Sequence, residues 1–165
     1  MNGADAPFTL ASFAVLALHG AMLRNIPAIL SPDILHTLRA MGHGDVLAIT
    51  DANFPAYSMG CKVHRLDGIP ATDVLDAVLT LMPLDSFIPD PAYTMQVVGD
   101  ADAVPEIVAE FQGIIDRVSD NPTKITSAER FAFYDRAKSS FAVIQTGETR
   151  LYGNILLTKG IIPPG

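Results

Sequence analysis

His43 is the residue of this sequence best suited to transfer a proton, because it lies between Gly42 and Gly44 in the segment MGHGD. Imidazole titrates near neutral pH and can therefore both donate and accept a proton. The flanking glycines allow backbone conformations that other residues avoid, and they leave space for a ligand beside the ring. The alternative is purely structural: Gly42 ends a helix and His43 follows it.

Asp51 is a second candidate, since it directly follows the short apolar segment DVLAIT at 45–50. A carboxylate at the end of a strand can accept a hydrogen bond from a ligand hydroxyl or orient an imidazole. An Asx turn that closes the strand is the structural alternative. Asp45, at the start of the segment, fits a turn or strand entry better.

Two further groups of polar residues lie near the C-terminus. Arg130 and Tyr134, in RFAFYDRAK, are four residues apart and would share one face of a helix, where a guanidinium and a phenol could both bind sugar hydroxyls. The segment YGN places the hydrogen-bonding side chains of Tyr152 and Asn154 around Gly153. Taken alone, the first pattern also fits a solvated helix face and the second a simple turn.

Motifs for metals, nucleotides and serine nucleophiles are missing from the sequence. The histidines are His19, His36, His43 and His64. They show neither HxH nor HExxH spacing, and there is no CxxC, so we expect no metal site. No GxGxxG, GxxxxGK[ST] or GxSxG segment is present, which argues against a nucleotide cofactor and against serine hydrolysis. A metal-dependent enzyme that uses His43, Asp51 and His64 is kept as a distant alternative.

The composition fits one folded domain. The chain has 165 residues, of which 49% are hydrophobic, and a formal charge of -7 without any Lys/Arg cluster. Such a chain can form a core, and its acidic character makes nucleic acids and anionic membranes poor partners. Its single cysteine, Cys61, cannot form an internal disulfide and suits a cytoplasmic, reducing compartment. We expect Cys61 to be a small, buried or half-buried side chain.

Residues 1–21 differ from the rest of the sequence. We interpret them as a non-core N-terminal extension from an upstream start codon, followed by one domain at 22–165. A weak export signal is the alternative, because FTLASFAVLAL has the length of a signal-peptide apolar core. However, Asp5 precedes it and no Lys or Arg does, and the segment is too short for a confident membrane span.

The remaining sequence alternates between helical and strand patterns. Helices are predicted at 31–42, 72–82, 104–119 and 127–140, with Ser31 and Ser127 as N-caps; strands are predicted at 45–50, 62–66, 93–99, 123–126, 141–148 and 153–160. This alternation indicates an α/β domain with a largely parallel or mixed sheet. Ligands of such sheets collect beyond the carboxyl ends of the strands. Asp51 occupies such a position, and we expect the glycine-flanked His43 to lie close to it.

Four segments in order and spacing, MGHGD, DANFPA, RFAFYDRA and YGNILLTKG, resemble the ribose pyranase/fucose mutarotase family. The similarity runs from about Met22 to the C-terminus and is greatest to the L-fucose mutarotase branch. It implies a three-layer α/β/α fold, ring-shaped homo-oligomers of the decamer type, and sites that use a neighbouring subunit. It also implies a monosaccharide substrate and no cofactor.

The resemblance implies that the chain exchanges the anomers of a free aldose, L-fucose above all, with His43 as the proton-transferring residue. The residues expected to bind the sugar are Asp51, Arg130, Tyr134, Tyr152, Gly153 and Asn154. Ring opening and reclosure need a group that gives and takes protons near neutral pH, and they need neither a metal nor a nucleotide. The alternatives are a non-catalytic sugar-binding accessory protein of carbohydrate uptake and a D-ribose pyranase-type activity.

Overall fold

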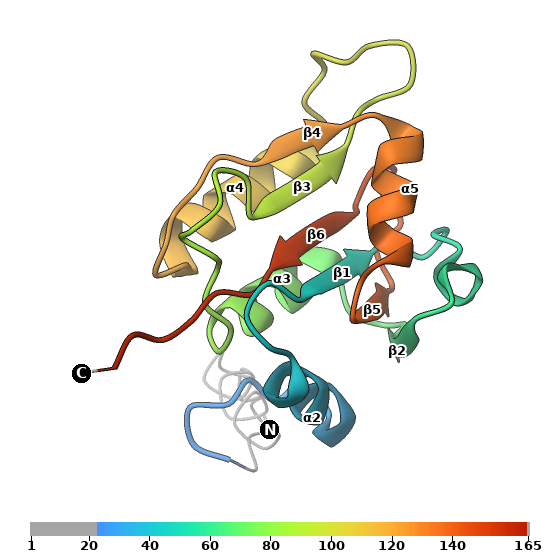
Figure 1. Cartoon of the computed structure of the whole chain (residues 1–165). Coiled ribbons are helices and arrows are strands. Elements are labelled where there is room, and N and C mark those ends of the chain that lie inside the picture. Colours follow the sequence, from blue (N-terminus) through green and yellow to red (C-terminus); the bar gives the residue numbers. More distant parts are fainter. Residues whose placement is uncertain (1–22, 165) are drawn as a thin grey trace, which may run out of the picture.

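The computed structural model describes residues 23–164, and the predicted extension at 1–21 lies outside them. Figure 1 shows a central sheet flanked by helices. The helices are α2 (Pro32–Ala40), α3 (Ala71–Leu79), α4 (Glu106–Val118) and α5 (Arg130–Lys138), with a 3-10 turn η2 at Ala56–Met59. The strands are β1 (Val46–Thr50), β2 (Lys62–Leu66), β3 (Ala92–Met95), β4 (Thr126–Ala128), β5 (Ala142–Thr146) and β6 (Ile155–Thr158).

The six strands form one mixed sheet in the order β2-β5-β1-β6-β3-β4. β1 runs parallel to β5 with Leu47 opposite Ala142, whereas β6 is antiparallel to both of its neighbours, β1 and β3. The ends of β1, β3, β4 and β5 therefore lie along one edge of the sheet, together with the start of β6. We call this the carboxyl edge and the opposite one the amino edge.

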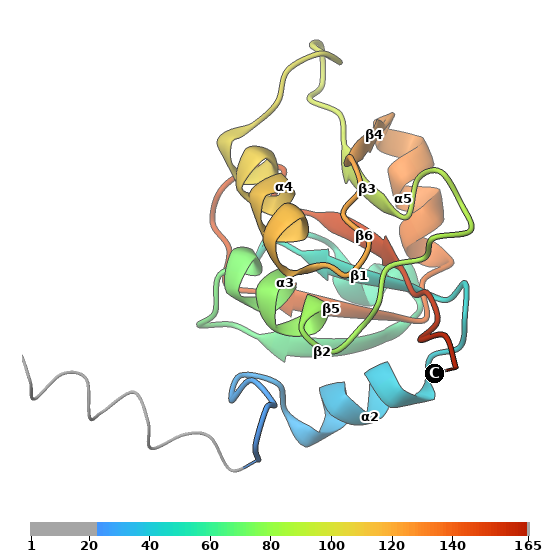
Figure 2. The same ribbon diagram turned by 90° about the vertical axis from the view of Figure 1, so that its left-hand side faces the viewer.

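Side chains alternate between two cores, one on each face of the sheet. Leu47 and Ile49 of β1 point into a core with α2, α3 and α4, whereas Ala48 points into a smaller core that includes Phe133 of α5. Figure 2 shows α3 and α4 on one side of the sheet and α5 on the other. The predicted three-layer α/β/α architecture is confirmed.

Three predicted boundaries near the carboxyl edge are wrong: the start of the helix at 127, the strand at 123–126 and the end of the strand at 99. Ser127 does not cap a helix: it lies within β4, and α5 is capped by Glu129, whose carboxylate accepts hydrogen bonds from the N–H groups of Phe131 and Ala132. The strand predicted at 123–126 is correspondingly shifted to Thr126–Ala128. β3 ends at Met95, and the segment that follows turns at Gly99, where φ is +86°.

The segment around His43 is a turn between α2 and β1. Ser31 caps the start of α2 as predicted, since its hydroxyl accepts a hydrogen bond from the Ile34 N–H. Gly42 is not the left-handed stop of this helix; the left-handed residue is Gly44, with φ of +85°. The Gly42 N–H instead donates to the carboxylate of Asp45 at 2.7 Å, which confirms Asp45 as a turn residue.

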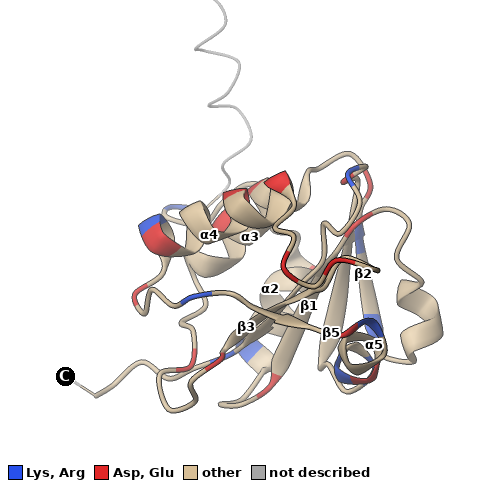
Figure 3. Cartoon of the chain, turned by 90° about the horizontal axis from the view of Figure 1, so that it is seen from above, with Lys and Arg blue, Asp and Glu red and all other residues tan. Residues whose placement is uncertain are grey.

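Charged residues are spread over the surface of the described residues. Figure 3 shows Lys and Arg on several separate elements, while acidic residues follow the outer sides of α3 and α4. None of the helices in the described part of the chain has the length and apolar character that crossing a membrane requires.

Candidate functional site

A cleft of about 210 Å³ opens at the carboxyl edge of the sheet. The predicted site residues that line it are Asp51, Arg130, Tyr134, Tyr152 and Asn154. They come from the end of β1, the first turns of α5 and the turn before β6. These segments meet because β1 and β4 end, and β6 begins, at this same edge. The fold thus brings three segments that are distant in sequence into one cleft, and only Asp51 among them was predicted from its place at a strand end.

Asp51 is the most firmly held polar group of the cleft. Its side chain is buried, and its Oδ2 accepts a hydrogen bond of 2.6 Å from Nδ2 of Asn154. The Asp51 N–H donates in return to Oδ1 of Asn154 at 3.0 Å, and Oδ1 of Asp51 accepts the Asn53 N–H in an Asx turn. Burial raises the pKa of the Asp51 carboxyl, and the bond from Asn154 acts in the opposite direction. The Asx turn predicted for Asp51 is therefore present, and it leaves the carboxylate in a fixed orientation in the cleft wall.

The turn before β6 adopts an unusual backbone conformation. Tyr152 has φ of +64°, which is uncommon for a residue other than glycine, and its hydroxyl accepts the Val98 N–H at 3.1 Å. A Cβ on Gly153 would lie 2.7 Å from Cγ of Glu148 and 3.5 Å from Cβ of Asp51. Because Gly153 has no side chain, its backbone lies close to Glu148 and Asp51 beneath the cleft. Tyr152 contributes its side chain to the cleft wall.

Aromatic rings form another part of the cleft wall. The ring of Tyr134 stacks on Phe54 with centroids 5.6 Å apart and planes at 20°. The guanidinium of Arg130 lies 5.9 Å from the centroid of the Tyr134 ring. Aromatic faces beside a few fixed hydrogen-bonding groups are typical of small-molecule sites.

His43 lies at the opposite end of β1 from this cleft. It precedes the strand, and Asp51 follows it, so the five residues of β1 separate them by roughly 16 Å at about 3.3 Å per residue. The prediction that both residues share one rim is therefore wrong within a single chain. Ligands collect beside residues that follow a parallel strand. His43 instead precedes β1, in the turn from α2, and therefore lies at the amino edge.

The partner of His43 within the chain is Asp85. Nε2 of His43 lies 3.2 Å from Oδ1 of Asp85, which is buried and also accepts the Phe87 N–H at 2.9 Å. The imidazole side chain itself remains 45% exposed, and its ring centroid is 5.4 Å from that of Phe87. A fixed carboxylate thus orients an accessible imidazole. The sequence analysis missed Asp85, because an acid 42 positions away carries no local signal.

The three residues of the metal alternative do not come together. His64 is buried on β2, and its ring Nε2 lies 2.8 Å from the Thr37 hydroxyl. His43 and Asp51 lie at opposite edges of the sheet. Across positions 23–164, no group of three or more His, Cys, Asp or Glu side chains could hold a metal ion. Cys61 is half-buried, as predicted.

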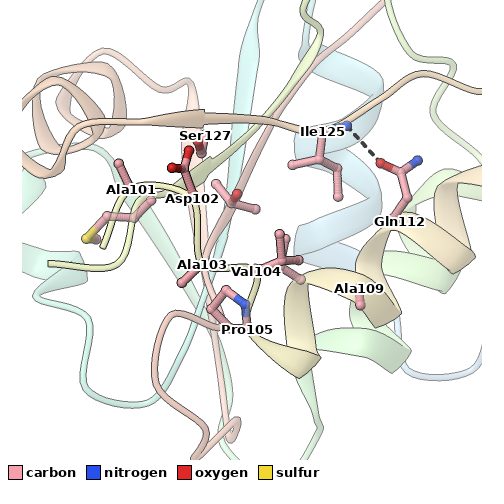
Figure 4. A pocket seen from close by; sticks show the side chains of 12 residues that line it. Ala101, Asp102, Ala103, Val104, Pro105, Ala109, Gln112, Ile125 and Ser127 are labelled. Atoms are coloured by element: carbon pink, nitrogen blue, oxygen red, sulfur yellow. Dashed lines mark hydrogen bonds between the residues drawn. The ribbon is translucent and has the colours of Figure 1, made fainter. Parts of the chain in front are cut away.

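A larger hollow, of about 520 Å³, lies between β3, β4 and the start of α4 (Figure 4). Its wall is largely apolar and includes Val104, Pro105 and Ala109. The carbonyl oxygen of the Gln112 side chain, also in this wall, already accepts the Ile125 N–H at 2.9 Å. None of the predicted site residues lines this hollow, and the smaller cleft is therefore the candidate site.

An ion pair supports the turn beneath the cleft. Nε and Nη2 of Arg150 donate to the two carboxylate oxygens of buried Glu148 at 2.9 and 3.0 Å. Nη1 of Arg150 also donates to Glu110 of α4 at 2.8 Å. The hydrogen bonds from Arg150 lower the pKa of Glu148 below its ordinary value. This network ties the segment that carries Tyr152 to α4.

Replacement of Glu148 by glutamine is expected to lower the free energy of unfolding by about 1–2 kcal/mol at pH 7. The folded-state pKa of Glu148 is depressed, so its ionised form stabilises the fold above 4.5, and this stability is lost as the pH falls through the depressed value. Urea unfolding at pH 7 and pH 4 should therefore show a smaller acid loss in Glu148→Gln than in the wild type. Glu110→Gln, which removes only the exposed arm of the network, is the matched control. Equal effects of the two substitutions would contradict this role.

The fold and the cleft define a small-ligand-binding α/β/α domain. Residues 24–162 match the model of the RbsD / FucU transport protein family, and the chain belongs to this family. It is 41% identical over 142 residues to an L-fucose mutarotase of Actinobacillus pleuropneumoniae, covering 86% of this chain and 99% of that protein. It is 41% identical over 146 residues to the human fucose mutarotase, covering 85% and 94%. The resemblance seen in the sequence is thereby confirmed.

Solved structures agree with this assignment. The fucose mutarotase of Streptococcus pneumoniae in complex with L-fucose superposes with a TM-score of 0.79 at 41% identity, covering 86% of this chain and all of that one. The Bacillus subtilis RbsD complexed with D-ribose, at 20% identity, has a TM-score of 0.66 over 81% of this chain and 95% of that one, and shares the fold.

Proposed function

We propose that this protein is a sugar mutarotase that exchanges the anomers of L-fucose by opening and reclosing the sugar ring. The observation that carries the proposal is the convergence of Asp51, Arg130, Tyr134 and Tyr152 in one cleft of a chain 41% identical to fucose mutarotases. Asp51 accepts a hydrogen bond from a sugar hydroxyl, and Arg130 donates one. Asn154 fixes Asp51 by donating to its carboxylate and by accepting a hydrogen bond from its backbone N–H.

The reaction needs a group that gives and takes protons near neutral pH, and the cleft of one chain contains no histidine. Opening the ring protonates the ring oxygen while the anomeric hydroxyl loses a proton, and reclosure reverses both transfers. Imidazole serves both directions near neutral pH. We assign this role to His43, which Asp85 holds in a fixed orientation while leaving it accessible.

We further propose that His43 and Asp85 of a second copy complete the cleft. Apolar side chains flank both parts: Val98 and Leu151 are exposed beside the cleft, and Phe87 and Ile88 are exposed beside His43. The surface beside the cleft differs from the surface beside His43. Each copy therefore contacts one neighbour through its cleft surface and a second neighbour through its His43 surface. Such a head-to-tail contact closes into a ring when its rotation allows, which agrees with the predicted ring-shaped homo-oligomer. We place this assembly in the cytoplasm, as the single cysteine suggests.

The direct test is saturation-transfer NMR of L-fucose at anomeric equilibrium, with and without the purified protein. We expect faster exchange between the two anomer signals, unchanged by a metal chelator. A panel with D-ribose and other aldoses separates fucose mutarotation from a ribose pyranase activity. If no aldose exchanges faster with the protein near neutral pH, the proposed function is wrong.

A sugar-binding protein without turnover is the second candidate. Its supporting observation is that Asp51, Arg130 and Tyr152 form the cleft within one chain, without His43. This candidate predicts binding of L-fucose, for example by calorimetry, together with no acceleration of anomer exchange. The NMR experiment therefore distinguishes the two functions.

A further inference from the structure

The segment after β6 contacts both loops that carry the His43–Asp85 pair. The Gly44 N–H donates to the Lys159 carbonyl at 2.9 Å, and the Lys159 N–H donates to the Asp45 carbonyl at 2.9 Å. One residue earlier, the Thr158 carbonyl accepts the Asp85 N–H at 3.0 Å. The C-terminal end of β6 thus lies between the two loops and is bonded to each.

The side chain of Lys159 adds a second attachment on the His43 side. Its Nζ donates to the carbonyls of Leu38 and Met41, at 2.9 and 2.5 Å. These carbonyls belong to the last turn of α2 and its C-cap, where a cation satisfies free acceptors and complements the helix dipole. Burial lowers the pKa of the Lys159 amine, because the ammonium is partly removed from water. Lys159 therefore fixes Met41, the residue directly before the turn that carries His43.

Gly160 provides the matching attachment on the Asp85 side. Its N–H donates to the Pro83 carbonyl at 2.8 Å. A Cβ at this position would lie 2.5 Å from the Leu84 carbonyl oxygen and 2.9 Å from Cα of Asp85, so a side chain would displace the loop. The close approach of the two backbones depends on a glycine here.

We propose that Lys159 and Gly160 are positioning residues that set the geometry between His43 and Asp85. Neither lines the cleft, and each acts through backbone groups next to the pair. This inference rests on the proposed function, in which His43 transfers the proton. Since a displacement of about 1 Å can cost on the order of 10²-fold in rate, loosening either attachment should slow the chemical step.

The test compares Lys159→Met, which keeps an apolar stem of similar length, with Lys124→Met at an exposed position between α4 and β4. We expect Lys159→Met to lower kcat for L-fucose exchange by about 10- to 100-fold while KM stays within about twofold, because the cleft is untouched. The imidazole Cε1–H resonance of His43 should move. Lys124→Met should match the wild type in all three readouts.

Gly160→Ala is the second variant, and it decides the matter if Lys159→Met does not fold. We expect the same pattern: a lower kcat, an unchanged KM and a shifted His43 resonance. Wild-type kcat and an unmoved resonance in a folded variant would overturn the inference, and so would a rise in KM with kcat unchanged. If the wild type shows no exchange activity at all, the proposed function fails, and the His43 resonance alone then decides whether the two residues position the imidazole.

Discussion

Replacing His43 by alanine should slow the exchange of L-fucose anomers by about 10²- to 10⁴-fold, the usual contribution of one acid–base group. The imidazole is accessible and hydrogen-bonded to Asp85, whereas the proposed sugar-binding groups lie in a cleft at the opposite edge of the sheet. We therefore expect the affinity for L-fucose to change little. Saturation-transfer NMR measures the rate, and calorimetry measures the affinity.

His36→Ala is the matched control, because His36 is an exposed histidine on α2. It should exchange L-fucose at the wild-type rate. Size-exclusion chromatography and circular dichroism should show that both variants keep the fold and the assembly state. A His43→Ala protein with more than about half of the wild-type rate would remove the histidine from the mechanism, since an acid–base residue contributes far more than this.

A second large effect is expected when two inactive variants are combined. His43→Ala removes the proposed proton-transferring group, and Asp51→Asn removes the carboxylate of the cleft. If a site takes its cleft from one copy and its histidine from another, a mixed assembly contains some intact sites. Random mixing in equal amounts gives an intact pair at about one site in four, and hence about a quarter of the wild-type activity.

The mixing experiment is done by co-expression with two different affinity tags, followed by sequential purification. The control is a single variant co-expressed with itself under the two tags. This assembly should remain inactive. Arg130→Ala replaces Asp51→Asn in a parallel experiment, in case the loss of the Asp51–Asn154 bond disturbs the fold. A mixed assembly no more active than its parts would show that the cleft and the histidine do not meet between copies.

The sequence predicts most of this fold because helical and strand patterns are strong and local. It also predicts the place of Asp51, since the strand-end rule needs only the polarity of a strand and the residue that follows it. The other predicted site residues of the cleft were expected from the family resemblance. The apolar segment before Asp51 was sufficient to predict that this residue lies at the end of a strand. The short strand β4 was misplaced because its three residues carry no alternation, and because Ser127 resembles a helix cap.

The same strand-end rule places His43 at the opposite edge, because it precedes β1 in the chain, and the prediction overlooked this. The role of Asp85 could not be read in this way. It depends on β6, which runs antiparallel between β1 and β3, although alternating patterns favour parallel pairing. The contact between His43 and Asp85 also joins residues 42 positions apart. Such contacts are set by the tertiary arrangement of loops. Periodicity and local spacing in the sequence carry no information about that arrangement.

In the proposed ring, the strand β6 determines how many active sites one altered subunit affects. It is four residues long and fully buried, it starts next to Asn154 in the cleft, and it ends beside the loops of His43 and Asp85. In a head-to-tail assembly these two ends serve different active sites. A destabilising substitution in the middle of this strand would thus impair two adjacent active sites at once. One altered subunit would lower the activity of the sites that it shares with both of its neighbours.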